Sequence, residues 1–136
     1  MRSMTISQDL ASRVSDAERR TAFTTGLEHV VDAHGCREAA LRSRPTLERL
    51  CAAIISDLGL RIVAEPQWHI FPGPGGVTGL FLLAESHLSV HTFPEHHYAA
   101  LNLYCCRSSQ EWQWREALEQ MLGAQRVTVR TLTRGT

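Results

Sequence analysis

Strict alternation of residue character between Ser86 and Phe93 constrains the fold more than any other feature of the chain. Successive residues of a β-strand point to opposite faces, so Ser86, Leu88 and Val90 share one face, while two histidines, Ser89 and Phe93 share the other. This pattern is typical of a half-buried strand. Buried polar groups need hydrogen-bond partners. Any one of these polar residues would suit a solvated sheet face, but together they favour a functional site.

Two further strands are expected to pair with this one. Val77 to Leu83 precedes it, and Tyr98 to Cys105 follows after Pro94-Glu95-His96-His97. Links of hairpin length connect antiparallel neighbours. Further strands are expected at residues 26–33, at residues 60–71 with a break near Pro66, and at residues 126–132.

Two helices are expected from apolar residues at helical spacing. The first has Pro45 in its first turn and ends at Gly59. Its apolar face consists of Leu47, Leu50, Cys51, Ile54, Ile55 and Leu58. The second begins near Ser108, which resembles a capping box with Glu111, and ends before Gly123. Its buried side consists of Trp114, Leu118, Met121 and Leu122.

The order of these elements predicts the fold class. One strand, a helix, four strands, a helix and a last strand indicate an α+β fold, a two-layer sandwich in which both helices pack on one face of an antiparallel sheet. A chain of 136 residues suits one domain with a real core. Residues 1–22 show little periodicity, so we expect a flexible N-terminal arm followed by a single domain over residues 23–136.

Composition excludes several classes of function. The formal net charge is zero, so nothing favours nucleic acid or an anionic membrane as partner. No apolar run approaches the roughly 20 residues that span a bilayer, and residues 1–20 lack the apolar centre of a secretory signal, so we expect a cytoplasmic protein. The chain contains no lysine, which excludes a P-loop lysine and the internal lysine of a pyridoxal-phosphate enzyme.

A family resemblance lies in the segment that contains the alternating strand and the residues after it. Residues 85–95 and 98–100 match Glu-Ser-His-x-[Ser/Thr]-x-His-Thr-Trp-Pro-Glu followed by Tyr-Ala-Ala, except that Phe93 replaces tryptophan. The chain therefore resembles bacterial S-adenosylmethionine decarboxylase proenzymes, with weaker similarity from about Gly26 to the C-terminus. The resemblance implies a pyruvoyl-dependent carboxy-lyase that supplies decarboxylated S-adenosylmethionine for the synthesis of spermidine and other polyamines.

The resemblance also implies how the cofactor forms. Autocatalytic serinolysis would begin when the Ser86 hydroxyl attacks the carbonyl of Glu85. β-Elimination and hydrolysis would then leave a pyruvoyl group, derived from Ser86, at the start of a second chain. That ketone would form a Schiff base with the substrate amine and accept electrons as carbon dioxide leaves.

Further roles follow from the resemblance, position by position. His91 and Thr78 match residues that assist processing, His91 by proton transfer. Cys106 matches the cysteine that donates a proton to the decarboxylated carbon. Glu95 matches the acid that binds the substrate ribose, and Phe71 matches the aromatic residue that stacks on adenine.

Strand geometry and the resemblance both point to a site shared between subunits. Ser86 and His91 have opposite parity and lie about 16 Å apart on a regular strand. Either the strand is broken, or His91 serves the Ser86 of a second subunit. The resemblance implies a homodimer in which each site contains residues of both subunits. Such a dimer is isologous and has two composite sites.

Several departures from the family pattern keep alternatives open. They are Phe93 for tryptophan, Asn102 for a common aspartate, Arg107 for glycine, Glu28 for a frequent histidine and His97 for glycine. Because most of them would touch the substrate pocket, a decarboxylase for another amino acid, such as arginine or ornithine, stays possible. A dimeric homologue that never cleaves itself is a second alternative.

A metal-binding module is the alternative from another class of protein. The histidines of residues 87–97 and the cysteine pair at 105–106 could supply zinc ligands. His87 and His91 would lie about 13 Å apart on an extended strand, which is too far for one ion. The sequence signal for a metal is therefore weak, and we expect none.

Overall fold

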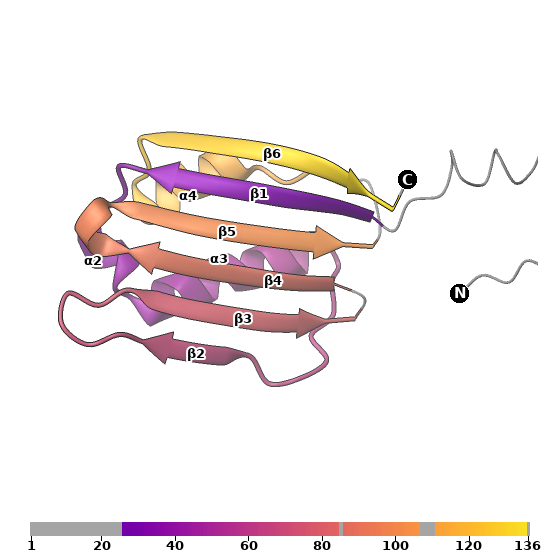
Figure 1. Cartoon of the computed structure of the whole chain (residues 1–136), viewed down its shortest axis with the longest axis horizontal. Helices are drawn as coiled ribbons and strands as arrows, with labels where there is room; N and C mark the ends of the chain where they lie inside the picture. The colour runs from indigo at the N-terminus through magenta and orange to yellow at the C-terminus, as the bar shows by residue number, and fades with distance from the viewer. Residues whose placement is uncertain (1–25, 85, 107–110, 136) are drawn as a thin grey trace, which may run out of the picture.

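The computed structural model describes residues 26–84, 86–106 and 111–135. Six antiparallel strands lie in the order β2-β3-β4-β5-β1-β6 (Figure 1). In chain order the elements are β1 (Gly26–His34), α2 (Glu38–Leu41), α3 (Arg44–Asp57), β2 (Gln67–Ile70), β3 (Val77–Leu83), β4 (Ser86–Phe93), the 3-10 turn η1 (Pro94–His96), β5 (Tyr98–Cys105), α4 (Trp114–Leu122) and β6 (Arg126–Arg134).

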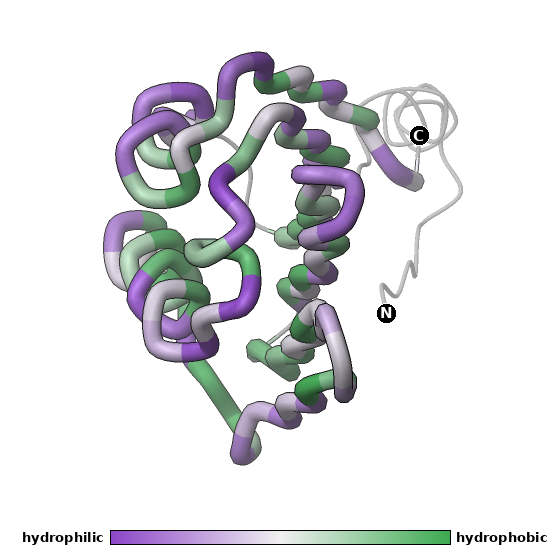
Figure 2. Tube along the Cα trace, turned by 90° about the vertical axis from the view of Figure 1, so that its left-hand side faces the viewer, coloured by the Kyte–Doolittle hydropathy of each residue, from purple (hydrophilic) through white to green (hydrophobic). Residues whose placement is uncertain are grey.

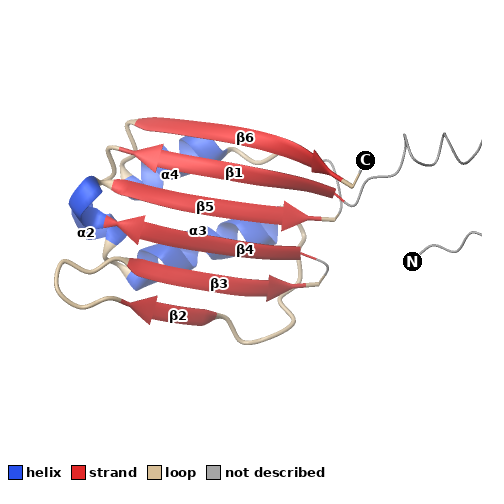
Figure 3. Ribbon diagram, viewed as in Figure 1, coloured by secondary structure: helices blue, strands red, loops and turns tan. Residues whose placement is uncertain are grey.

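The helices all cover the same face of the sheet, as the edge-on view of Figure 2 and the ribbon of Figure 3 show. The core lies between the two layers, where strand residues such as Val31 and Leu88 pack with helix residues such as Leu50 and Leu118, all fully buried. This arrangement confirms the predicted α+β two-layer sandwich.

The opposite face carries no helix of the described residues, and we call it the open face. Alternating burial along the strands, together with their register, assigns its residues. Its residues include Thr78, Leu80 and Leu82 of β3; His87, Ser89, His91 and Phe93 of β4; Tyr98 and Asn102 of β5; Glu28 and Asp32 of β1; and Arg130, Leu132 and Arg134 of β6.

The first long helix forms where the apolar spacing predicts it. Ser43 is the N-cap of α3, and its hydroxyl accepts the backbone N–H of Thr46 at 3.2 Å. Of the predicted apolar face, every residue from Leu47 to Ile55 is buried, and Leu58 packs partly against the core. Burial raises the pKa of the Cys51 thiol to about 12, so Cys51 is a structural core residue.

Two predicted boundaries are wrong. The break expected near Pro66 is present, but the strand expected over residues 60–71 is ordered as β2 only over Gln67–Ile70, and upstream of Pro66 a single bridge joins Ile62 to Leu83. Proline has no N–H for the ladder, so it interrupts the pairing. The last helix begins at Trp114 rather than near Ser108, which lies outside the described residues.

The residues just before α4 are joined to the end of α3 by a tertiary contact. The indole N–H of Trp112 donates to the Asp57 carboxylate at the end of α3, at 2.8 Å. This bond fixes the chain outside a helix just before Gln113, the N-cap of α4.

The predicted arm over residues 1–22 lies outside the described residues, so it stays a prediction, as does the domain boundary. Within the described part of the chain, no helix is both long enough and apolar enough to cross a membrane.

Candidate active site

Strand β4 is regular along its whole length, which separates Ser86 from His91. It pairs with β3 from Ser86, opposite Leu83, to His91, opposite Thr78, and it pairs with β5 throughout. Ser86 is on the helix side and buried, while His91 is on the open face and half-buried. Five residues of strand correspond to about 16 Å. Strand β4 is therefore unbroken between Ser86 and Phe93.

Ser86 has an unusual environment for a buried hydroxyl. Its side chain is 9% exposed, and its Oγ has no hydrogen-bond partner among the described residues. A buried polar group without a partner costs about 1–3 kcal/mol. No described residue therefore holds the hydroxyl in place as a donor or an acceptor. Glu85, the other half of the predicted cleavage site, lies outside the described residues.

Cys106 follows directly on the strand that flanks Ser86. Ser86 is in register with Cys105, the last residue of β5, and the side chain of Cys105 is buried while that of Cys106 is partly exposed. The backbone of Gly26, with φ +140°, packs so closely on Cys105 and Cys106 that it leaves no room for a side chain. The start of β1 therefore fixes the backbone that carries Cys106.

A pocket of about 400 Å³ lies at the other end of β3 and β4. Its lining comes from the loop after β2, the start of β3, the end of β4 and η1. The residues are Phe71, Pro72, Pro74, Gly75, Gly76, Thr78, His91, Thr92, Phe93 and Glu95. The structure therefore brings together four of the seven predicted site residues, namely Phe71, Thr78, His91 and Glu95.

The two predicted processing residues in this pocket are in direct contact. Thr78 and His91 are register partners on β3 and β4, and Thr78 Oγ1 lies 3.1 Å from His91 Nδ1. The bond fixes the orientation of the imidazole ring at the pocket wall. Phe71 at the pocket rim is 47% exposed, and its ring meets that of His69 edge-on with centroids 4.5 Å apart.

Thr92 shapes this pocket, although the sequence reasoning did not select it. Its buried hydroxyl donates to the carbonyl of Leu41 at 2.7 Å and accepts the backbone N–H of Val77 at 2.8 Å. Two bonds thus tie α2, β3 and β4 together beside the pocket. The available signal was a polar residue at a buried-face position of β4, where Ser86 is the other such residue.

The loop of residues 71–76 is held by backbone contacts. The N–H of Phe71 donates to Gly76 O at 2.9 Å, and Arg42 Nε donates to Pro74 O at 3.1 Å. These bonds close the loop over the pocket and give the Phe71 ring a fixed base.

The open face also carries side-chain hydrogen bonds between strands. Two of the departures from the family pattern contact each other, because Asn102 Nδ2 donates to Glu28 Oε2 at 2.9 Å. Hydrogen bonds from Asn102 and Arg134 lower the pKa of Glu28. At the far end of the same strands, Tyr98 donates its hydroxyl to Asp32 at 2.5 Å, which raises the pKa of Tyr98 to about 12.

A third departure from the family pattern, His97, lies at a position whose backbone conformation favours glycine. It follows η1 with φ 52° and ψ 41°, the left-handed conformation that glycine adopts most readily. Here the conformation is supported by a contact of the His97 ring, whose Nδ1 lies 3.0 Å from Cys36 O.

The zinc-module alternative gains no support from side-chain placement. Among the described residues, no three His, Cys, Asp or Glu side chains are grouped to hold a metal ion. His87 contacts Asn102, whereas His91 contacts Thr78.

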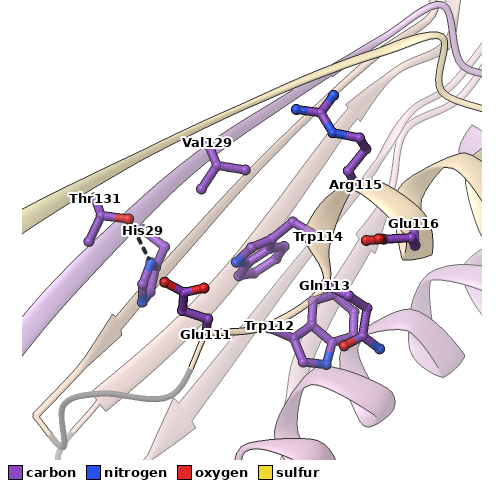
Figure 4. Close-up of a pocket in the computed structure, with 9 residues that line it drawn as sticks. All are labelled: His29, Glu111, Trp112, Gln113, Trp114, Arg115, Glu116, Val129 and Thr131. Atoms are coloured by element: carbon purple, nitrogen blue, oxygen red, sulfur yellow. Dashed lines mark hydrogen bonds between the residues drawn. The ribbon is translucent and has the colours of Figure 1, made fainter.

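A second pocket, of about 290 Å³, lies on the helix side between β1, β6 and the start of α4 (Figure 4). His29 faces it with Nδ1 3.2 Å from Thr131 Oγ1, and Glu111 and Trp114 lie beside the ring. Burial lowers the pKa of His29, and the Glu111 carboxylate opposes this effect. None of the predicted site residues lines this pocket.

Comparisons with known proteins agree with the resemblance. The family described as S-adenosylmethionine decarboxylase matches residues 27–135. The S-adenosylmethionine decarboxylase proenzyme of Caldicellulosiruptor saccharolyticus is 32% identical over 111 residues, which are 81% of this chain and 88% of that protein. The proenzyme of Geobacillus kaustophilus is 35% identical over 114 residues, 82% of this chain and 89% of that protein.

A solved structure shares the fold. The crystal structure of the adenosylmethionine decarboxylase from Aquifex aeolicus superposes with a TM-score of 0.71 and 25% identity, over 85% of this chain and 94% of that one. The family match covers most of the chain, and the two proenzymes are similar over most of their own length. The chain therefore belongs to the S-adenosylmethionine decarboxylase proenzyme family.

Proposed function

We propose that this chain cleaves itself between Glu85 and Ser86 and that the processed protein decarboxylates S-adenosylmethionine. The observation that carries the proposal is the Ser86 hydroxyl, which is buried, has no hydrogen-bond partner among the described residues, and stands at the start of β4 in a member of this family. A serine hydroxyl in a purely structural role would be bonded, as that of Thr92 is.

The Ser86 position also suits the pyruvoyl group that the family uses. That group supplies an electron-accepting carbonyl, which a chain without lysine cannot obtain through an internal aldimine. Cleavage at this point frees a chain end at the first residue of a strand rather than within one. Cys106, beside the register partner of Ser86, is the group that would deliver a proton to the substrate carbon.

The pocket between β3, β4 and η1 is the part of the protein that would bind the substrate. Its volume lies within the range of about 300–1,000 Å³ that small-molecule sites occupy. Phe71 offers an aromatic surface for a purine, and the Glu95 carboxylate offers an acceptor for ribose hydroxyls. The pocket's imidazole, His91, is oriented by Thr78.

We further propose that the working unit is a homodimer with composite sites. One chain holds Ser86 and Cys106 at one end of the sheet and the substrate pocket at the other, about 16 Å apart along β4. A two-fold partner with its open face against this one would bring the pocket of one subunit toward the end of the sheet at which β4 of the other begins.

The composition of the open face supports this arrangement. Leu80, Leu82 and Leu132 on that face are each about half exposed, at 48%, 59% and 49%. A partner that packs on this face, which no helix of the described residues covers, would remove these apolar side chains from water. Four charged residues on that face are paired within the subunit, Arg134 with Glu28 and Arg130 with Asp32.

The experiment is a decarboxylation assay of purified protein with S-adenosylmethionine, arginine and ornithine, each labelled at the carboxyl carbon. We expect labelled carbon dioxide from S-adenosylmethionine and none from the Ser86→Ala variant. Turnover of arginine or ornithine alone would establish the alternative substrate, which the departure at Phe93 in the wall of the pocket keeps in view. Release from none of the three would contradict the proposed activity.

A further inference from the structure

Four side chains form a continuous chain of hydrogen bonds across four neighbouring strands of the open face. His87 Nε2 of β4 lies 3.1 Å from Asn102 Oδ1 of β5, and Asn102 Nδ2 donates to Glu28 Oε2 of β1 at 2.9 Å. Arg134 of β6 then donates from Nη1 to Glu28 Oε1 at 2.6 Å. The same four strands are adjacent in the sheet (Figure 1).

Each step of this chain joins diagonal neighbours on adjacent strands, the first step toward the end of β4 and the next two back toward its start. Asn102 is in register with Ser89, so its contact with His87 reaches two residues toward the start of β4. Glu28 is in register with Tyr104, two residues from Asn102 along β5, and Arg134 is likewise two residues from the β6 partner of Glu28. Diagonal neighbours on one sheet face are within reach of long side chains.

The bonding pattern leaves each group with a defined role. The Asn102 amide nitrogen is used on the Glu28 carboxylate, so its oxygen faces His87 and accepts, and the proton of that bond must sit on His87 Nε2. The bonds to the Glu28 carboxylate are charge-assisted, which makes them stronger than neutral ones. The Glu28 side chain is only 19% exposed, so water screens these bonds less than on an open surface.

His87 directly follows Ser86 and so links this series of hydrogen bonds to the proposed function, on which the following inference rests. His87 is the first open-face residue after Ser86. Once the peptide before Ser86 is broken, β4 begins with a free end, and strand ends without a covalent anchor fray. We propose that the series of hydrogen bonds from His87 to Arg134 keeps the N-terminus that self-cleavage creates paired within β4. His87 is thus a positioning residue for the pyruvoyl group.

The experiment compares hydrogen exchange of the β4 backbone in two backgrounds, the processed enzyme and the uncleavable Ser86→Ala chain. Asn102→Leu removes the link between His87 and Glu28. In the processed enzyme we expect exchange over residues 87–90 to rise about five- to ten-fold, the effect of losing about one hydrogen bond's stabilisation. In the Ser86→Ala chain, where the preceding turn still anchors the strand, the rise should stay below about two-fold.

The matched control is Ser89→Ala. Ser89 is the next open-face residue of β4 and the register partner of Asn102, yet it lies outside the chain of bonds. Its substitution should leave exchange unchanged in both backgrounds.

A compensating pair tests the bonding itself. Asn102→Asp alone places a second carboxylate against Glu28 and should raise exchange. Adding Glu28→Gln reverses donor and acceptor within the pair, and it should restore protection in the processed enzyme, together with turnover per pyruvoyl group. If the pair only stabilised the fold, restoring it would change hydrogen exchange equally in the processed enzyme and in the uncleaved Ser86→Ala chain.

The outcomes separate this inference from the proposed function. Mass spectrometry on every sample reports whether cleavage took place. An enzyme that cleaves but shows equal exchange increases in both backgrounds, or none, overturns the inference about His87 alone. A parent chain that never cleaves overturns both, because there is then no chain end to hold.

Discussion

Replacing Ser86 with alanine is expected to stabilise the uncleaved chain, which is the reverse of the usual effect of truncating a buried residue. The hydroxyl is buried without a hydrogen-bond partner among the described residues, so its removal eliminates a desolvation penalty of about 1–3 kcal/mol. The β-carbon, which becomes a methyl group, keeps its packing. We expect a net gain of about 1 kcal/mol, or roughly 4 °C in melting temperature for a domain of this size.

Thr92 on the same face of the same strand provides the matched comparison. Its hydroxyl makes two short bonds, to Leu41 O and from the Val77 N–H. Thr92→Val leaves both of those backbone groups buried without a partner. We expect a loss of about 2–4 kcal/mol, opposite in sign to the effect at Ser86.

Both substitutions are made in the His91→Ala chain, which retains Ser86 and serves as the uncleaved reference once mass spectrometry confirms that it is intact. Protein concentration is held constant, because the unfolding of dimers depends on concentration. Urea unfolding gives the free energies. A loss of stability at Ser86 comparable to that at Thr92 would refute the reasoning, since it would mean that the Ser86 hydroxyl is bonded.

The other predictions concern catalysis, assembly and pH. Cys106→Ala should cleave normally but lose at least about ten-fold in turnover, as expected for loss of a proton donor; an unchanged rate removes Cys106 from catalysis. Mixing Ser86→Ala chains with His91→Ala chains should restore activity in mixed dimers, and no recovery would argue against shared sites. Burial lowers the pKa of His29 from 6.5, so the unfolded chain binds this proton more tightly. Stability should therefore fall as pH drops below about 6.5, and His29→Gln should reduce that slope in urea titrations.

Local patterns predicted the elements that carry the site. The alternation from Ser86 to Phe93 predicted the bounds of β4 and the residues on each of its faces. In a sheet that is covered on one side, every second residue of a strand is buried. The apolar spacing from Leu47 to Ile55 likewise predicted the buried side of α3. The opposite parity of Ser86 and His91 was enough to predict that their side chains lie on opposite faces of β4.

Features that depend on distant contacts could not be predicted. The pairing of Glu28 with Asn102 joins positions 74 residues apart and requires the register between β1 and β5. Helix α2 has four residues, too few for a periodic signal, and it contacts β4 through the Thr92 bond to Leu41. The pocket likewise depends on how the loop of residues 71–76 folds back toward β4 and η1.

Intact mass of the freshly purified protein under denaturing conditions tests the central claim most directly. The account predicts two fragments, residues 1–85 and residues 86–136, the second lighter by one ammonia than a peptide that begins with serine. Borohydride should add hydrogen to that second fragment alone. A single chain with the full mass of 136 residues, unreactive toward borohydride, would contradict the account.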